Sequence, residues 1–155
     1  MDLQHQEKIK HVVFTINNEK YCLKITSVKE VMEMPHLTEV PNSPVFVVGV
    51  VNLRGVVLTV IDGVDYFEGS KFENTEHTRI LVFEDEHTGV LVGILVDNVY
   101  EVISIARNEI QSFVKDKGAK PYIKGLYHTE SDVYIVLNEH RLFDTSDSVV
   151  VTDAS

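Results

Sequence analysis

The chain has 155 residues, of which 44% are hydrophobic and 25% are charged, as in an ordinary globular protein. Its 14 Lys and Arg residues against 24 Asp and Glu residues give a formal net charge of −10, which disfavours nucleic acids and anionic membrane surfaces as partners. The sole cysteine, Cys22, excludes an internal disulfide and a multi-cysteine zinc site, and no apolar run approaches the roughly 20 residues of a membrane-spanning helix. We therefore expect one cytoplasmic domain, in which Cys22 packs as a small hydrophobic side chain.

The N-terminal part of the chain predicts two strands and then a short helix. Alternating apolar and polar residues predict strands over Lys10–Ile16 and Lys20–Ile25, which a turn at Asn17-Asn18 joins. Ser27 and Glu30 have the spacing of a capping box, so we expect a short helix that begins near Ser27 and stops before the next proline.

The most informative stretch reads GVVNLRGVVLTVID, from Gly49 to Asp62. Two short apolar runs, Val47–Leu53 and Val56–Ile61, predict a hairpin whose strands are buried on both faces. Gly55 permits the positive φ that the tight turn requires. Arg54 is the only charge in this hairpin before Asp62, so its side chain either extends along the turn into solvent or pairs with a carboxylate, for which Glu30 and Asp62 are the candidates.

The remainder of the chain predicts further short strands separated by polar turns. Residues 63–76 are polar and contain glycine, so we expect a surface loop with one helical turn around Tyr66-Phe67. A short helix or turn is expected near residues 106–113, a last helical turn near 139–143, and a mobile acidic tail over 146–155. The predicted strands are Thr78–Phe83, Gly89–Val96, Val99–Ile105, Tyr122–Tyr127 and Val133–Leu137. Nine or ten such strands favour small barrels or a sandwich.

The stretch from Gly49 to Asp62 resembles the core signature of the CheW family of chemotaxis adaptors, Gly-x-x-Asn-Leu-Arg-Gly-x-x-x-Pro-Val-Ile-Asp-Leu. The matching residues are Gly49, Asn52, Leu53, Arg54, Gly55, Val60, Ile61 and Asp62. Four further segments resemble the family in the same order: His11–Ile25, Val28–Val31, which matches the family's first helix, Gly89–Val102 and Tyr122–Phe143. The resemblance covers about residues 10–143. It implies a mainly β fold of two side-by-side five-stranded SH3-like barrels with a few short helices. We expect a single domain over 8–145, with subdomains at about 18–68 and 77–127.

The resemblance also implies a function and the residues that serve it. The protein is expected to be a non-catalytic adaptor, recruited to membrane receptor arrays, that couples chemoreceptor tips to the regulatory domain of a CheA-type histidine kinase. The family positions associated with receptor binding and signalling correspond to Val28, Glu30, Gly49, Arg54 and Gly93. For the two glycines, a bend in the sheet is an equally good explanation.

Val45 and Phe46 form a second candidate surface. They follow Pro44 in a loop, where an exposed aromatic side chain among valines is typical of a protein–protein contact. Burial of Phe46 in the core is the alternative, and the sequence leaves both open.

No motif points to catalysis, a cofactor or a metal. The chain contains no phosphate-binding glycine loop, no His-Glu-x-x-His and no Gly-x-Ser-x-Gly, and its seven histidines are scattered. A β-barrel that binds a small ligand such as a nucleotide is the alternative function. The chain departs from the family pattern at Thr59, at Gly63-Val64 and at Lys24, and we expect these changes to affect partner choice rather than the fold.

Overall fold

The computed structural model describes residues 7–68, 73–85, 88–112 and 120–142. These residues form ten strands, one α-helix and two 3₁₀-helices. The strands are β1 (Lys8–Ile16), β2 (Glu19–Lys24), β3 (Val28–Glu33), β4 (Val47–Leu53), β5 (Val56–Asp62), β6 (Arg79–Glu84), β7 (Leu91–Val96), β8 (Asn98–Ala106), β9 (Ile123–His128) and β10 (Val133–Leu137). The helices are η1 (Ile25–Ser27), α1 (Gly63–Glu68) and η2 (Arg107–Glu109). None of the helices in the described part of the chain has the length and apolar character that crossing a membrane needs.

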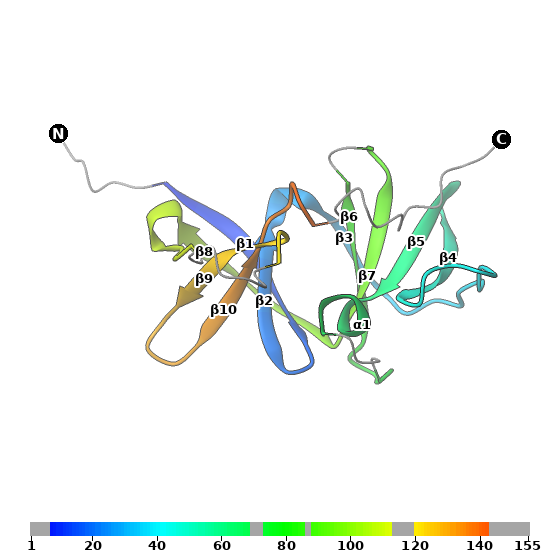
Figure 1. The fold of residues 1–155 in the computed structure, drawn as a ribbon, viewed down its shortest axis with the longest axis horizontal. Coiled ribbons are helices and arrows are strands. Elements are labelled where there is room, and N and C mark those ends of the chain that lie inside the picture. The colour runs from blue at the N-terminus through cyan, green and yellow to red at the C-terminus, as the bar shows by residue number, and fades with distance from the viewer. Residues whose placement is uncertain (1–6, 69–72, 86–87, 113–119, 143–155) are drawn as a thin grey trace.

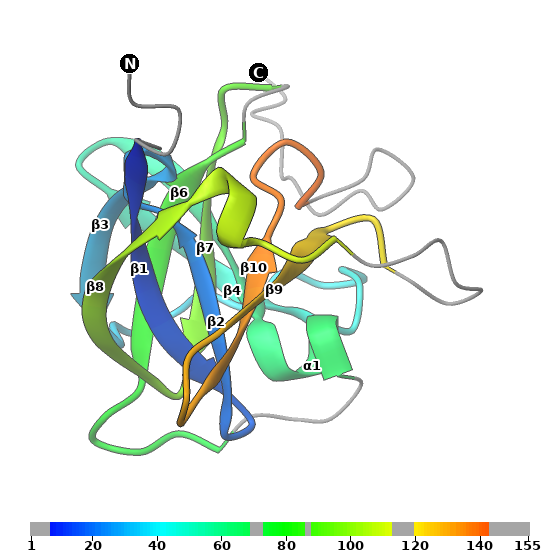
Figure 2. The ribbon, with the colours of Figure 1, turned by 90° about the vertical axis from the view of Figure 1, so that its left-hand side faces the viewer.

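The strands form two five-stranded sheets that lie side by side (Figure 1). The first sheet has the order β8-β1-β2-β10-β9 and faces the viewer in Figure 2, and the second has the order β3-β6-β7-β5-β4. Neighbouring strands are antiparallel except for two parallel pairs, β2 with β10 and β5 with β7. The second sheet is continuous in sequence and lies between β2 and β8, so the chain leaves the first sheet and later returns to complete it.

Each sheet curls in the SH3-like manner but is not a closed barrel. Within the described residues, no ladder joins the outer strands β8 and β9, or β3 and β4. Single bridges take the place of a ladder: Thr38, after β3, pairs with Val50 on β4, and Gln111, after β8, pairs with Leu126 on β9. The expected pair of side-by-side five-stranded SH3-like units is thus confirmed, with open sheets whose edges are bridged in place of closed barrels.

A shared core holds the two sheets together. The largest buried cluster combines side chains from both sheets, including Phe14 and Leu23 of the first and Ile61 and Ile94 of the second. Each sheet also has a smaller core of its own. Val13, Cys22, Ile105, Tyr134 and Val136 form that of the first sheet, and Leu58, Val60, Ile80, Val82 and Leu95 that of the second. Because successive strand residues face opposite sides, β1 supplies Phe14 to the shared core and Val13 to the smaller one.

The structure corrects three of the expected elements. The helix expected after Ser27 is wrong: Val28–Glu33 is strand β3, whose residues are alternately half-buried and exposed and pair with β6. Strand β4 is mostly half-buried rather than buried on both faces, because it is the outer strand of its sheet. The helical turn expected around Tyr66-Phe67 is present as α1, but Tyr66 and Phe67 pack against the shared core instead of lying in a surface loop.

The described C-terminal segment is held to the first sheet by polar contacts. Lys24 of β2 pairs with Glu139 at 3.1 Å, and the Asn138 N–H donates to the Tyr122 carbonyl at 2.7 Å. Within its described part, residues 139–142, the expected last helical turn is a non-helical turn that the Arg141 N–H closes on the Asn138 carbonyl. Residue 143 and the expected tail at 146–155 lie outside the described residues.

Candidate functional site

Arg54 lies at the tip of the hairpin between β4 and β5, in a turn whose backbone is left-handed. Arg54 has φ 49° and Gly55 has φ 87°, the pair of positive values that a two-residue hairpin turn requires. The Gly55 N–H donates to the Asn52 side-chain oxygen at 2.8 Å, which fixes the turn. The sequence predicted this hairpin and its turn correctly. Its geometry directs the Arg54 side chain away from the ladder, and 73% of that side chain is exposed.

The Arg54 guanidinium pairs with Glu30, one of the two carboxylates that the sequence offered. Arg54 Nη2 donates to Glu30 Oε1, across from the hairpin tip to β3. The other candidate, Asp62, accepts hydrogen bonds from the Val64 and Asp65 N–H groups and caps α1. Since β3 and β4 are the outer strands of the second sheet, the ion pair connects its two edges.

Two exposed valines are close in sequence to this ion pair. Val31 follows Glu30 on β3 and is 44% exposed, and Val56 follows the hairpin turn on β5 and is 48% exposed. We call Glu30, Val31, Arg54 and Val56 the Arg54 edge. The sequence did not single out the two valines, because alternation along β3 and β5 shows two faces but not which of them is outside.

The three remaining residues expected at the receptor site contact the protein's own core. Gly49 lies where the chain crosses β4: a Cβ built there would be 2.6 Å from the Thr38 carbonyl oxygen. Gly93 lies in the core of the second sheet, and its Cβ would be 2.6 Å from Ile80 Cγ2. Val28 is half-buried against the shared core. The structure therefore brings Glu30 and Arg54 together at the surface, while the two glycines meet only through β5, where Val60 pairs with both.

Val45 and Phe46 differ in exposure. Val45 is 82% exposed in the loop before β4. Phe46 is half-buried, its ring 5.1 Å from that of Tyr66 in an edge-to-face arrangement, and its carbonyl accepts the Asp62 N–H at 2.7 Å. Of the two alternatives that the sequence left for Phe46, the structure selects packing against the core.

The described residues do not assemble a reactive or metal-binding centre. Burial raises the pKa of the Cys22 thiol to about 12, so this side chain is a packing group, as expected. In the part of the chain that the structure describes, no three His, Cys, Asp or Glu side chains are grouped as metal ligands.

The chain is similar to known proteins over almost its full length. A model of the family described as CheW-like domain matches residues 10–147. The protein named chemotaxis protein CheW of Bacillus subtilis is 32% identical over 147 residues, covering 93% of this chain and 86% of that protein. The PilI protein of Pseudomonas aeruginosa is 26% identical over 134 residues, covering 83% of this chain and 72% of that protein.

The fold is also similar to that of a solved structure. The scaffolding protein TtCheW of Thermoanaerobacter tengcongensis superimposes with a TM-score of 0.81 at 30% identity, covering 97% of both chains. The resemblance seen in the signature hairpin thus extends to the strand order, the sheet pair and the sequence as a whole. This chain belongs to the CheW-like domain family.

Proposed function

We propose that this protein is a non-catalytic chemotaxis adaptor that couples chemoreceptor tips to the regulatory domain of a CheA-type histidine kinase. The observation that carries this proposal is the family match over residues 10–147, together with the likeness of nearly the whole chain to a scaffolding protein. An adaptor of this kind performs no covalent step. It raises the effective concentration of kinase near receptor by binding both on one rigid body.

The Arg54 edge is the surface that we assign to the receptor. A guanidinium held in place by Glu30 loses little conformational freedom when it binds a carboxylate or carbonyl of a partner. The exposed Val31 and Val56, which are close in sequence to Glu30 and Arg54, would supply the apolar contact that a helical segment requires. In this arrangement Val28, Gly49 and Gly93 do not contact the receptor themselves, and they support the surface by setting the positions of β3, β4 and β7.

The loop that contains Val45 is the surface that we assign to the kinase. Val45 is the most exposed of the large hydrophobic side chains in the described residues, and Phe46 anchors its loop on Tyr66. Val45 would make the contact and Phe46 would position it. The nucleotide-binding alternative has no described feature in its favour.

The test is a pair of titrations, one with a receptor cytoplasmic fragment and one with the kinase regulatory domain, both from the same genome. Arg54→Ala is expected to weaken receptor binding and Val45→Ser kinase binding, each leaving the other titration unchanged. Arg107→Ala, which removes an exposed arginine from η2, is the matched charge control. Absence of binding to either partner at about 100 μM, with the protein shown to be folded, would contradict the adaptor function.

A further inference from the structure

Two buried side-chain atoms have no hydrogen-bond partner among the described residues, and both belong to the first sheet and the segment that follows it. One is His11 Nε2 on β1, in a residue that is 1% exposed. The other is Glu139 Oε2 after β10, where the side chain is 6% exposed although the residue as a whole is half-buried. Buried polar atoms of native proteins are almost always paired, either with protein or with an ordered water molecule. These two atoms therefore require a partner.

The other contacts of the two side chains show that both unpaired atoms are acceptors. The Nδ1–H of His11 donates to the Ile9 carbonyl oxygen at 2.8 Å. Because a carbonyl only accepts, the hydrogen of the neutral ring is on Nδ1, and Nε2 has a lone pair. The Glu139 carboxylate binds Lys24 Nζ through Oε1 at 3.1 Å, so Oε2 likewise offers only lone pairs. Two acceptors cannot pair with each other, and each requires a hydrogen from a donor.

The two acceptors belong to one cluster of side chains. His11 lies directly opposite Lys24 in the ladder of β1 and β2, and Lys24 in turn contacts Glu139. Lys124 of β9 is near enough to both His11 and Glu139 for its charge to act on them. Three strands and the segment after β10 thus bring an imidazole, a carboxylate and two ammonium groups together.

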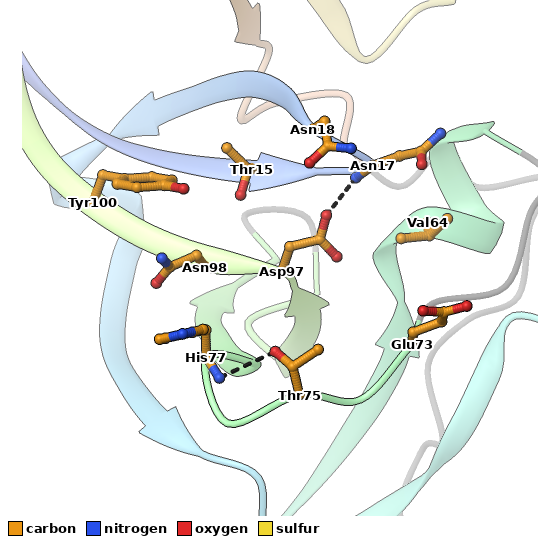
Figure 3. A pocket seen from close by; sticks show the side chains of 10 residues that line it. All are labelled: Thr15, Asn17, Asn18, Val64, Glu73, Thr75, His77, Asp97, Asn98 and Tyr100. Carbon is orange, nitrogen blue, oxygen red and sulfur yellow. Dashed lines mark hydrogen bonds between the residues drawn. The ribbon is translucent and has the colours of Figure 1, made fainter.

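The pocket between the end of β1 and the corner of β7 and β8 is a weaker candidate for a site (Figure 3). Its two carboxylates belong to Glu73, which is exposed, and to Asp97, which already accepts the Asn17 N–H at 2.6 Å. Neither of the unpaired buried atoms lines this pocket. In the part of the chain that the structure describes, the cluster around His11 and Glu139 therefore has the stronger requirement for a ligand.

The charge of the cluster indicates which donor fits. Two ammonium groups and one carboxylate leave a surplus of one positive charge, which repels a further cation. The lone pairs of His11 Nε2 and Glu139 Oε2 repel an anion. A neutral molecule with two hydrogens to donate remains, and the smallest is water. An internal water typically makes about three hydrogen bonds, which the two acceptors and a neighbouring lysine can supply.

We propose that this cluster binds one internal water molecule, which donates one hydrogen to His11 Nε2 and the other to Glu139 Oε2. The water links β1 to the last described segment of the chain. It thus holds this segment in place together with the Lys24–Glu139 pair and the hydrogen bond from the Asn138 N–H to the Tyr122 carbonyl. This site does not depend on the adaptor function.

The first experiment is a crystal structure of the full chain at a resolution that shows ordered water. One water molecule is expected within about 3 Å of both His11 Nε2 and Glu139 Oε2. In solution, NMR cross-peaks between long-lived water and the ring protons of His11 are expected, whereas exposed His36 should give none. A site without water, a water on only one of the two atoms, or direct contact of Lys124 Nζ with Glu139 Oε2 would overturn the proposal.

A pair of variants tests whether the water holds the C-terminal segment. His11→Phe keeps a planar ring but removes the acceptor, so the Asn138 N–H should exchange with deuterium about tenfold faster. His36→Phe, at an exposed histidine, should leave this exchange unchanged. The amide of Leu81, buried on the inner strand β6 of the second sheet, is the reference for global unfolding and should change less than that of Asn138. Equal acceleration at both amides, or unchanged exchange at Asn138, would overturn the link that the water makes.

Discussion

The two sheets repeat one strand arrangement with strands from different parts of the chain. Replacing β8, β9, β10, β1 and β2 by β3, β4, β5, β6 and β7 converts the order of the first sheet into that of the second. The parallel pairs correspond, and so do the edge bridges, each of which follows a glycine: Gly49 precedes Val50, and Gly125 precedes Leu126. A Cβ on either glycine would contact the backbone of the crossing segment, at 2.6 Å from the Thr38 oxygen and 2.4 Å from the Gln111 oxygen.

The sheets differ at their surfaces and at one core position. The second sheet has the short turn at Arg54-Gly55, whereas the first has a longer tip in which Asp132 pairs with Lys20 at 2.7 Å. In the core, Gly93 of the second sheet corresponds to Cys22 of the first. Val60 pairs with both Gly49 and Gly93, and in the same way Val136 pairs with both Gly125 and Cys22. Both sheets thus have the same glycine and bridge at the edge, whereas their exposed hairpin tips differ. Such a difference suits the proposed scaffold, which would bind two unlike partners.

The largest expected effect on stability comes from replacing the glycine that lies at the bridged edge of each sheet. Gly49→Ala and Gly125→Ala should each destabilise the protein by about 2–3 kcal/mol, since the added Cβ meets backbone that cannot move aside. Gly93→Ala should have a similar cost, because its Cβ would lie 2.6 Å from Cγ2 of Ile80, a fully buried β-branched side chain. Chemical denaturation measures all three, with exposed Ser104→Ala as the control. Unchanged stability of any of the three alanine variants would contradict this expectation.

The core position at which the sheets differ offers a second test. Cys22→Ser places a hydroxyl among the apolar side chains of Val13, Ile105 and Val136, which offer it no hydrogen-bond partner. This substitution should lower the free energy of unfolding by about 1–3 kcal/mol. Cys22→Ala removes only the small sulfur group and should cost less than the serine variant. The midpoint of denaturation gives both values. If alanine were the worse substitution, cavity formation rather than polarity would dominate at this position.

Among the described residues, the first sheet has a buried histidine, His11, near the half-buried Glu139, which predicts acid sensitivity. Burial is the main reason why the pKa of His11 lies below its ordinary value of 6.5, and Lys124 and Lys24 lower it further, while the hydrogen bond to Ile9 and the nearby Glu139 act to raise it. The unfolded chain therefore takes up a proton that the folded one refuses, and stability should fall as the pH decreases below about 6.5.

Glu139 adds to this acid sensitivity at lower pH. Burial acts to raise its pKa, but its backbone hydrogen bond and Lys24 outweigh burial, so the pKa of Glu139 is lowered and its contribution is lost on protonation. Melting temperatures between about pH 7.5 and 5 test the histidine. His11→Gln should flatten the slope there, whereas exposed His36→Gln should not. A parallel slope in both variants would assign the effect to other groups.

The smallest expected effect concerns stability at the two tips. Exposed ion pairs contribute less than about 1 kcal/mol, so Arg54→Ala should hardly change the melting temperature even though we expect it to weaken receptor binding. Lys20→Ala, at the other tip, should likewise leave stability nearly unchanged and should also leave receptor binding intact. Loss of receptor binding with both variants would indicate diffuse charge attraction instead of a defined Arg54 edge.

The sequence predicted the strands well because alternation and turn residues are local properties. The Asn17-Asn18 turn, with φ values of 53° and 66°, and the Arg54-Gly55 turn were correct, and Glu30 is one of the two partners that the sequence offered for Arg54. The helix expected at Val28 failed because a capping-box spacing was given more weight than the alternation of Val28, Glu30 and Met32. Pairing with β6, which is distant in sequence, decides that segment.

The contributions of individual site residues depended on tertiary contacts that no local pattern contains. Phe46 lies against Tyr66, twenty residues later, and Gly93 against Ile80 of the neighbouring strand. A single sequence therefore indicated Arg54 at the hairpin tip and two possible partners for it, but not the contacts of Phe46 and Gly93.

The insertion of one sheet within the other has a consequence for synthesis. When the ribosome has made β7, the second sheet has all its strands, from Val28 to Val96, whereas β1 and β2 still lack β8, β9 and β10. We expect the second sheet to form first during translation. Until β8, β9 and β10 are made, β1 and β2 can pack only against the second sheet, through the shared core. The parallel pairing of β2 with β10 joins residues more than a hundred positions apart, so it should be the last and slowest step of folding.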